Sequence, residues 1–443
     1  MTTLGASPFV WLQFDETGTL TEGDAAVQAL NQALAQNGAS DLVVLSHGWQ
    51  TDRPGAQGLY SRLWANACAA LPGTDPAKVV VAGVLWPSKP YNADYDGGRA
   101  LSVSAAAGGA LSTGAAGPGA ADLPDDDFGQ VLKDMEALLG ADDAAALVKA
   151  ARSAAASPGA GAFPFFAEAQ KALGVDPNHP DPELAETAQL FERASTAIGA
   201  QTLLGAYAMP LALPTVPGVG GAQGLGDVIH SAVQGVQNGV AKVLTLMSYF
   251  TMKARAGVVG DAMGAHVLPV LTAPSPVRLH LAGHSFGARL VTAAANTFAP
   301  HGALRLQTLT LLEGAYSQNG MTAGRGPYSG VLTKVPGPIA MTHTHNDLAC
   351  TLAYPLASRL SGDTTLSIGD KNDPYGAMGA NGAQLAAGLL APDSAATDKF
   401  APVRGKVNRF LADAYVVKTD QTDAHNNVDN PTCGKLLAAV ITS

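Results

Sequence analysis

The sequence predicts an α/β protein in which a mostly parallel central sheet carries helices on both faces. Apolar runs of strand length alternate with helical runs near the start of the chain and again in its second half. That alternation is typical of a parallel sheet wound with helices. The 443 residues, 47% of them hydrophobic, are enough for one large domain with a sizeable insertion, or for two domains.

The first ninety residues contain three of the expected strands. We expect strands at residues 9–14, 41–49 and 78–88, separated by helices at 21–37 and 57–71. The second strand ends in His47-Gly48-Trp49. Gly48 allows the backbone to turn, so that the amide of Trp49 points into a cavity as half of an oxyanion hole. The alternative is a loop with an incidental His-Gly pair.

The regular alternation stops after residue 90, and residues 91–227 contain no convincing buried strand. We predict that this stretch is a helical, Ala/Gly-rich cap, with helices at about 128–155 and 181–199, inserted into a core formed by 1–90 and 228–443. Such an insertion would lie over the carboxyl ends of the strands. No residue between 194 and 226 is charged, which favours a buried or substrate-facing apolar surface over contact with a membrane surface. The prolines there argue against a membrane span.

Composition excludes some classes of partner. A net charge of -10, a pI near 5.4 and the lack of a basic run argue against nucleic acid. The three cysteines, Cys68, Cys350 and Cys433, have no metal-like spacing and suit a reducing compartment. No signal peptide is apparent at the start of the sequence, so we expect a cytoplasmic protein. Nothing in the composition indicates the oligomeric state.

The strongest motif is Gly283-His284-Ser285-Phe286-Gly287, which lies between an expected strand at 277–282 and an expected helix at 288–295. A strand that reverses directly into a helix strains its central residue and tolerates only small neighbours, which explains the flanking glycines. Ser285 is therefore predicted to be a nucleophile at the positive end of a helix, and the Phe286 amide the second oxyanion donor. Because the chain has 50 glycines, a packing turn is the alternative.

Two later residues complete the chemistry that a nucleophilic serine needs. We expect strands at 306–312, 338–347 and 414–418, with Asp347 at the end of the second and His425 in the loop after the third. His425 would accept the proton of Ser285, and Asp347 would orient the imidazole. The rival acid is Glu313, which ends the preceding strand.

A metal site is the competing interpretation of the same region. His343, His345 and Asp347 alternate along one strand and resemble the H-x-H-x-D of metallo-β-lactamase-like hydrolases. That family's next ligand, a histidine, is replaced here by Leu348. We therefore predict no metal and no cofactor, and expect the two histidines to pack near the end of the sheet.

Five segments together resemble the α/β-hydrolase superfamily of serine hydrolases, with a lipase/esterase-like oxyanion loop: residues 46–49, 86–88, 283–287, 346–347 and 425. The likeness covers about 9–90 and 240–443, and the segments 253–260 and 354–359 look like a bacterial branch. The resemblance implies fold and reaction type but no substrate.

From these residues we expect a carboxylesterase-like enzyme that cleaves a small ester with an apolar acyl part through an acyl-enzyme. An amidase with the same triad and an inactive binding or scaffold protein are the alternatives. His47, Gly48, His284, Gly283 and Gly287 are expected to support the site.

Overall fold

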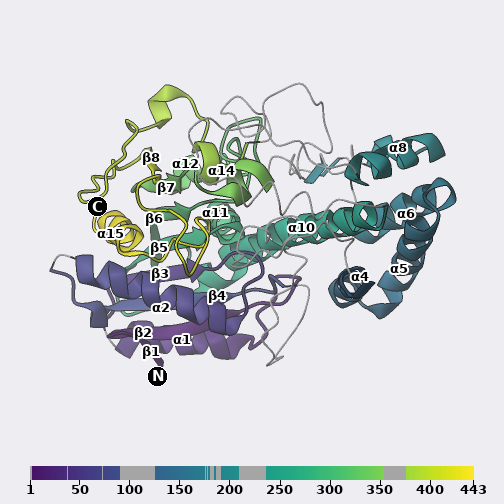
Figure 1. Ribbon diagram of the computed structural model, residues 1–443. Coiled ribbons are helices and arrows are strands. Elements are labelled where there is room, and N and C mark those ends of the chain that lie inside the picture. Colours follow the sequence, from purple (N-terminus) through teal and green to yellow (C-terminus); the bar gives the residue numbers. More distant parts are fainter. Residues whose placement is uncertain are drawn as a thin grey trace. The chain divides into compact units, whose positions relative to one another are not determined.

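The computed structural model describes residues 2–89 except 37 and 72, then 125–174, 191–208, 236–353 and 376–443, with a few isolated residues between 176 and 185. The described part is an α/β protein built on an eight-stranded sheet of order β1-β2-β4-β3-β5-β6-β7-β8 (Figure 1). Only β1 pairs antiparallel, with β2, and all other neighbours are parallel. The expected mostly parallel sheet is confirmed.

The strands lie in both halves of the sequence. They are β1 (Thr2–Leu4), β2 (Ser7–Gln13), β3 (Asp41–Ser46), β4 (Val79–Leu85), β5 (Val277–His284), β6 (Leu304–Leu312), β7 (Ile339–His343) and β8 (Val407–Leu411). The central strand β3 is buried along its whole length, as expected of a parallel strand covered on both faces.

The α-helices are α1 (Asp24–Gln36), α2 (Arg53–Ala70), α4 (Asp125–Leu139), α5 (Ala141–Ala156), α6 (Pro158–Leu173), α8 (Ala197–Ala208), α10 (Val236–Ala262), α11 (Phe286–Thr297), α12 (Val331–Lys334), α14 (Met378–Asn381) and α15 (Pro431–Ile441). Short 3-10 or π-helical turns are η1 (Pro76–Lys78), η2 (Met263–Val267), η3 (Leu268–Val270), η4 (Ala349–Ala353) and η5 (Ala387–Leu389).

Local sequence explains where the helices that cover the sheet begin. The Asp52 carboxylate accepts a hydrogen bond from Gly55 N at 2.9 Å, and a proline occupies the first turn of α2. Asn430 caps α15 in the same way, accepting from the amides of Thr432 and Cys433. The two caps therefore fix the starting points of α2 and α15.

The apolar core lies on both faces of the sheet. One cluster joins α2 and α15 to Val43 and Leu45 of β3. The intervening Leu42 and Val44 are equally buried but face the opposite side, because side chains alternate along a strand. Helix α11 contacts β5 and β6, and none of its buried side chains belongs to the first cluster, so it covers the second face.

The strand register determines which loops meet at the carboxyl end of the sheet. Ser46 pairs with Gly283, so the turn after β3 lies beside the turn after β5. Leu311 pairs with Met341, and His343 pairs with Leu411. The ends of β5, β6, β7 and β8 are therefore neighbours, as the candidate site requires.

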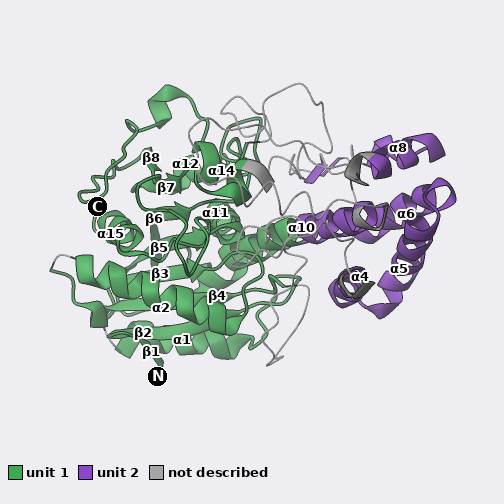
Figure 2. Cartoon of the chain, viewed as in Figure 1, with its two compact units in different colours: residues 1–89, 252–354, 369–443 green, residues 90–251, 355–368 purple. Residues whose placement is uncertain are grey.

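The chain divides into two compact units (Figure 2). The first contains residues 1–89, 252–354 and 369–443 and holds the sheet; the second contains 90–251 and 355–368. The described part of the second unit contains α4, α5, α6, α8 and the start of α10, and no strand lies in that part. This unit contains the whole of the insertion that we predicted at 91–227 and extends beyond it at its carboxyl end.

Some expected elements differ from those observed. The last strand is β8 at Val407–Leu411, not 414–418, and the helix expected at 128–155 is two helices, α4 and α5, because Gly140 between them has a φ of 85°. Of the helix expected at 181–199, the described residues 184–185 and 191–193 are helical, and a bend at 194–196 separates them from α8, Ala197–Ala208; the rest of 181–190 lies outside the described residues. Most of the uncharged stretch 194–226 and the segment 354–359 lie outside them too.

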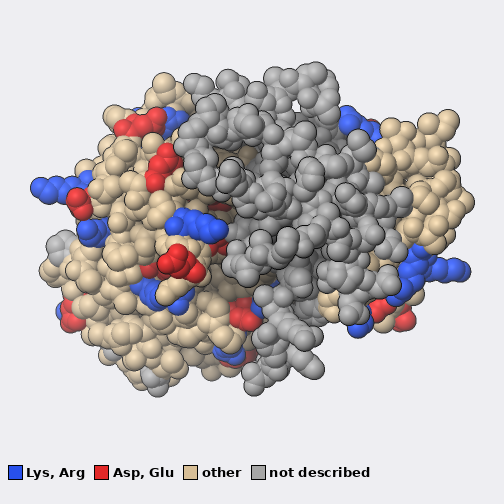
Figure 3. All heavy atoms as spheres, in the orientation of Figure 1, with Lys and Arg blue, Asp and Glu red and all other residues tan. Residues whose placement is uncertain are grey.

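The described surface has a mixed charge. On the face shown in Figure 3, acidic and basic side chains are interspersed over the described residues. In the part of the chain that the structure describes, no helix combines the length and hydropathy needed to cross a membrane.

Candidate active site

Ser285 occupies a strained turn between β5 and α11, as the motif predicts. Its φ of 57° and ψ of -125° are unusual for a residue with a side chain. A Cβ at Gly283 would collide with the carbonyl of Gly287, and a Cβ at Gly287 would collide with the carbonyls of Ser46 and His47. Both glycines are therefore required by close backbone approach, and Ser285 directly precedes the first residue of a helix.

The structure brings Ser285, His425 and Asp347 together, although they are far apart in sequence. Nε2 of His425 lies 2.9 Å from Ser285 Oγ, and Nδ1 lies 2.6 Å from Asp347 Oδ2. With the proton on Nδ1 donated to the carboxylate, Nε2 is free to accept the serine hydroxyl proton. The arrangement has the geometry of a nucleophile, a base and an orienting acid.

The protonation tendencies of the pair match those roles. Burial lowers the pKa of His425, but the charge of Asp347 and the hydrogen bond to it outweigh burial, so the pKa is raised above the ordinary 6.5. Burial raises the pKa of Asp347, and the neighbouring His425 together with hydrogen bonds brings it below 3.8. Asp347 is therefore ionised at neutral pH and stabilises the imidazolium.

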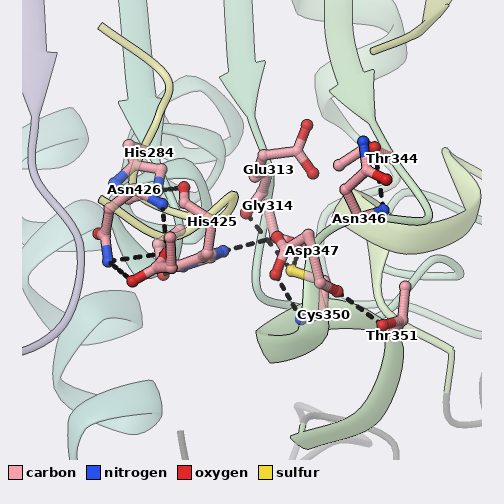
Figure 4. Close-up of polar contacts among 12 residues, drawn as sticks. His284, Glu313, Gly314, Thr344, Asn346, Asp347, Cys350, Thr351, His425 and Asn426 are labelled. Carbon is pink, nitrogen blue, oxygen red and sulfur yellow. Dashed lines mark hydrogen bonds and ion pairs between the residues drawn. The ribbon is translucent and has the colours of Figure 1, made fainter. Parts of the chain in front are cut away.

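Asp347 is completely buried and held by the turn that follows it (Figure 4). Its Oδ1 accepts a hydrogen bond from Cys350 N at 3.0 Å. Its carbonyl accepts from both the amide and the hydroxyl of Thr351, at 2.8 and 2.7 Å. These bonds leave Oδ2 directed at His425.

Glu313, the rival acid, is close but is not bonded to the histidine. It follows β6, is fully buried and has a φ of 45°. Neither carboxyl oxygen has a hydrogen-bond partner among the described residues, and Figure 4 draws no dashed line to them. Burial and the charge of Asp347 raise its pKa well above 4.5, which leaves Glu313 protonated at neutral pH.

The turn after β3 packs against Ser285. A Cβ at Gly48 would lie 2.7 Å from the Cβ and 3.2 Å from the Oγ of Ser285, so this backbone passes directly beside the hydroxyl. The ring of Trp49, which follows, lies 6.1 Å from that of Phe286. The side chains of the two residues expected to donate to an oxyanion, Trp49 and Phe286, are therefore close to each other.

His47 supports this turn as a neutral side chain. Burial lowers its pKa to about 4. Its Nδ1 donates to the carbonyl of Gly48 at 2.9 Å, its amide donates to Tyr60 Oη at 2.8 Å, and its ring stacks on Trp86 at 5.6 Å. The Trp86 indole donates to the carbonyl of His47 at 3.0 Å. The turn is therefore fixed from three sides.

His284 connects the turn at Ser285 to the loop that contains His425. Its Nε2 donates to the backbone carbonyl of His425 at 2.8 Å, and the two rings lie 4.8 Å apart. Burial and the nearby His425 lower the pKa of His284 to about 3, so it is neutral. It therefore supports His425 without competing for its proton.

The residues of the metal alternative do not converge. His345 is exposed and bonded to Asp413, whereas Nδ1 of the largely buried His343 has no hydrogen-bond partner among the described residues. Among those residues, the group whose potential ligand atoms all lie within 4.8 Å of one another is Asp347, Cys350 and His425, which includes neither histidine of the pattern.

Several contributors to the site were missed in the sequence. Tyr60 accepts from the His47 amide and donates to the carbonyl of Val84 at 2.6 Å, and Cys350 fixes Asp347 through its amide. Asp413 binds the loop before Asp347. These roles depend on backbone groups and on register, for which the sequence carries no motif.

Comparisons of the chain with family models, with curated proteins and with solved structures found no match. The site therefore has to be interpreted from its own geometry.

Proposed function

We propose that the protein is a serine hydrolase of the α/β-hydrolase type that cleaves carboxylic esters through an acyl-enzyme. The observation that carries the proposal is the continuous hydrogen-bonded chain from Ser285 Oγ through His425 to the buried Asp347. The nucleophile follows β5, the acid follows β7 and the base follows β8, which is the order Ser, acid, His expected of this type of enzyme. A turn with a purely structural role would not require these hydrogen bonds between Ser285, His425 and Asp347.

In the acylation step, Ser285 Oγ attacks the ester carbonyl while His425 Nε2 takes the hydroxyl proton. The carbonyl oxygen becomes an oxyanion, for which the amides of Trp49 and Phe286 are the proposed donors. When the tetrahedral intermediate collapses, its C–O bond to the alcohol breaks. His425 then returns its proton to the leaving alkoxide, and the acyl group stays on Ser285.

In the deacylation step, water attacks the acyl-serine while His425 accepts a proton from it. When the second tetrahedral intermediate collapses, the bond between the acyl carbon and Ser285 Oγ breaks, the carboxylic acid is released, and the proton on His425 passes to Ser285 Oγ. Throughout both steps Asp347 stays ionised and holds the imidazole in the Nδ1–H tautomer. No cofactor is needed for this sequence.

The substrate class is the less specific part of the proposal. The uncharged stretch at 194–226 favours an apolar acyl group. A Ser-His-Asp triad can also cleave amides, so an amidase is the first alternative. A binding or scaffold protein that kept the fold but has no activity is the second. We propose the ester because its alcohol leaves more readily than an amine.

A fluorophosphonate probe tests the nucleophile directly. We expect the wild-type protein to be labelled at Ser285 and the Ser285→Ala variant to stay unlabelled while folded. Peptide mapping identifies the modified residue. A wild-type protein that resists labelling, or a variant that labels equally well, would overturn the proposal.

A substrate panel then separates ester from amide. p-Nitrophenyl esters of increasing acyl length are assayed beside the matching p-nitroanilides. We expect turnover of the esters, with kcat/KM that rises as the acyl chain lengthens. Faster turnover of the anilides would assign the site to an amidase instead.

A further inference from the structure

The loop that precedes Asp347 is bound to the chain segment that follows β8 through one carboxylate. Oδ1 of Asp413 accepts hydrogen bonds from Thr344 Oγ1 at 2.7 Å and from His345 N at 2.9 Å. Its Oδ2 accepts from His345 Nδ1 at 2.8 Å. The register of β7 with β8, in which His343 pairs with Leu411, places Asp413 beside residue 345. One side chain thus binds two consecutive residues of the loop.

Asn346, the residue directly before Asp347, donates hydrogen bonds to the segment that contains Asp413. Nδ2 of Asn346 donates to the carbonyls of Asp413 and Val416, at 2.9 and 3.0 Å. The amide of Asn346 donates to Thr344 Oγ1 at 3.1 Å, so that hydroxyl both donates and accepts (Figure 4). Together these contacts fasten residues 344–346 to residues 413–416. We call Asp413, Thr344, His345 and Asn346 the acid-loop clamp.

The segment that bears Asp413 is also tied to the loop of the base. Nδ2 of Asn427 donates to the carbonyl of Val417 at 2.9 Å, and Nδ2 of Asn430 donates to that of Tyr415 at 3.0 Å. Residues 413–417 therefore touch the acid loop on one side and the chain next to His425 on the other. A displacement of this segment would change the separation between Asp347 and His425.

We propose that Asp413 is a positioning residue of the triad, which acts through the acid-loop clamp to keep the Asp347 carboxylate in contact with His425. The inference rests on the proposed function. The turn after Asp347 holds that residue through Cys350 and Thr351, and the clamp holds it from the other side. Misplacing a catalytic group by about 1 Å can cost about 100-fold in rate, so a loop end fixed on one side alone would be a weak support.

The Asp413 carboxyl of the clamp is ionised at neutral pH. Burial raises the pKa of Asp413, but hydrogen bonds from Thr344 and His345 outweigh it and lower the pKa below 3.8. The carboxylate can therefore accept all three bonds at neutral pH. An asparagine at this position keeps one carbonyl oxygen, enough for Thr344 Oγ1 and His345 N, but has no charge.

The test compares Asp413→Ala with Asp413→Asn, so that loss of hydrogen bonds is separated from loss of charge. For Asp413→Ala we expect kcat on a p-nitrophenyl ester to fall about 10- to 100-fold with KM nearly unchanged. For Asp413→Asn we expect most of the activity to remain. Asp398→Ala is the matched control, since that exposed carboxylate pairs only with Lys435 in the described structure, and we expect wild-type kinetics from it.

A second readout reports on the triad itself. The charge of Asp347 and the hydrogen bond to it raise the pKa of His425, so a displaced Asp347 lowers that pKa. We would follow it in Asp413→Ala by NMR titration of labelled histidine Cε1–H groups, assigned with a His425→Ala variant. We expect a lower His425 pKa in Asp413→Ala and a value close to wild type in Asp413→Asn.

Each outcome decides the inference. Unchanged kcat and an unchanged His425 pKa in Asp413→Ala would overturn it, as would equal pKa shifts in the alanine and asparagine variants, which would reduce the effect to charge. If Asp413→Ala does not fold, Thr344→Val removes one bond of the clamp and takes the same two readouts. If fluorophosphonate does not label the wild-type protein, the proposed function is wrong. The comparison of His425 pKa values remains valid in that case.

Discussion

Glu313 and Asp347 are two fully buried carboxyl groups that follow neighbouring strands, and among the described residues only the Asp347 carboxyl has hydrogen-bond partners. The register of β6 with β7 brings the two strand ends together. Burial and the charge of Asp347 raise the pKa of Glu313, because two negative charges cannot both be held close together in a dry site. The histidine binds one of them, and the other stays protonated.

This asymmetry predicts that Glu313 lowers stability as the pH rises. Glu313 binds a proton in the folded state but loses it near pH 4.5 when unfolded, so unfolding releases that proton above this pH. Glu313→Gln never ionises and should therefore be the more stable protein at neutral pH. We expect its advantage to grow by up to about 1.4 kcal/mol per pH unit above 4.5 and to vanish near pH 4. Urea unfolding at several pH values measures it; equal stabilities at pH 7 would contradict it.

The same pair predicts which acid the reaction uses. Asp347→Asn forces the wrong imidazole tautomer, and kcat should fall by about 10⁴-fold, the loss found for this change in a Ser-His-Asp protease. Because Glu313 has no hydrogen bond to His425 in the described structure, the Glu313→Gln variant should keep kcat close to wild type. Steady-state kinetics on one p-nitrophenyl ester compares the two variants. The reverse ranking would make Glu313 the catalytic acid.

The pH dependence of kcat/KM follows from the raised pKa of His425. The base works only when neutral, so the rate falls as the pH drops through that pKa. Because Asp347 holds the pKa above 6.5, we expect the acidic midpoint above 6.5. His284 and His47, with pKa values near 3 and 4, stay neutral throughout this range. A rate that stays level down to pH 4 would exclude a histidine base.

Gly48 is predicted to be as necessary as the glycines of the elbow. In Gly48→Ala the new methyl group would lie 2.7 Å from Ser285 Cβ, so the turn or the serine must move. We expect a loss of about 100-fold in kcat, with fluorophosphonate labelling slowed in parallel. Gly388→Ala is the control, since among the described residues a Cβ there would meet no atom within 4 Å beyond its chain neighbours. Equal kinetics for the two variants would show that the turn adapts.

A chelator distinguishes the triad from the metal alternative. His343 and His345 do not gather around Asp347, so we expect activity to be unchanged after dialysis against EDTA. Loss of activity that added Zn²⁺ restores would revive the metal interpretation. The assay needs only the wild-type protein.

The sheet and the strained turn at Ser285 could be predicted because each depends on local sequence. Strand β5, the strained Ser285 and the start of α11 form one continuous segment, and its glycines are dictated by nearby backbone. The order of strands with their loops also placed Asp347 and His425 at the same edge. Such features are encoded within a few residues of where they act.

The last strand could not be predicted in this way. The apolar residues Tyr415 and Val416 made 414–418 look like a strand in the sequence. In the structure they pack into the core cluster but lie outside the sheet. Strand β8 lies earlier and contains Asn408, a buried polar residue that bonds to the carbonyls of Ile339 and Val403. A run of apolar residues indicates that a segment is buried but not that it pairs with a neighbouring strand. A buried asparagine such as Asn408 interrupts the apolar pattern by which a strand is recognised in the sequence.

The separation of Ser285 and His425 by 140 residues has a consequence for how the protein is made. At a synthesis rate of about 5 to 20 residues per second, the ribosome adds His425 roughly 7 to 28 s after Ser285. Until then the growing chain contains Ser285 without the histidine that we propose as its base. If the proposed hydrolase function holds, the triad therefore cannot form before β8 and the loop that follows it have been synthesised.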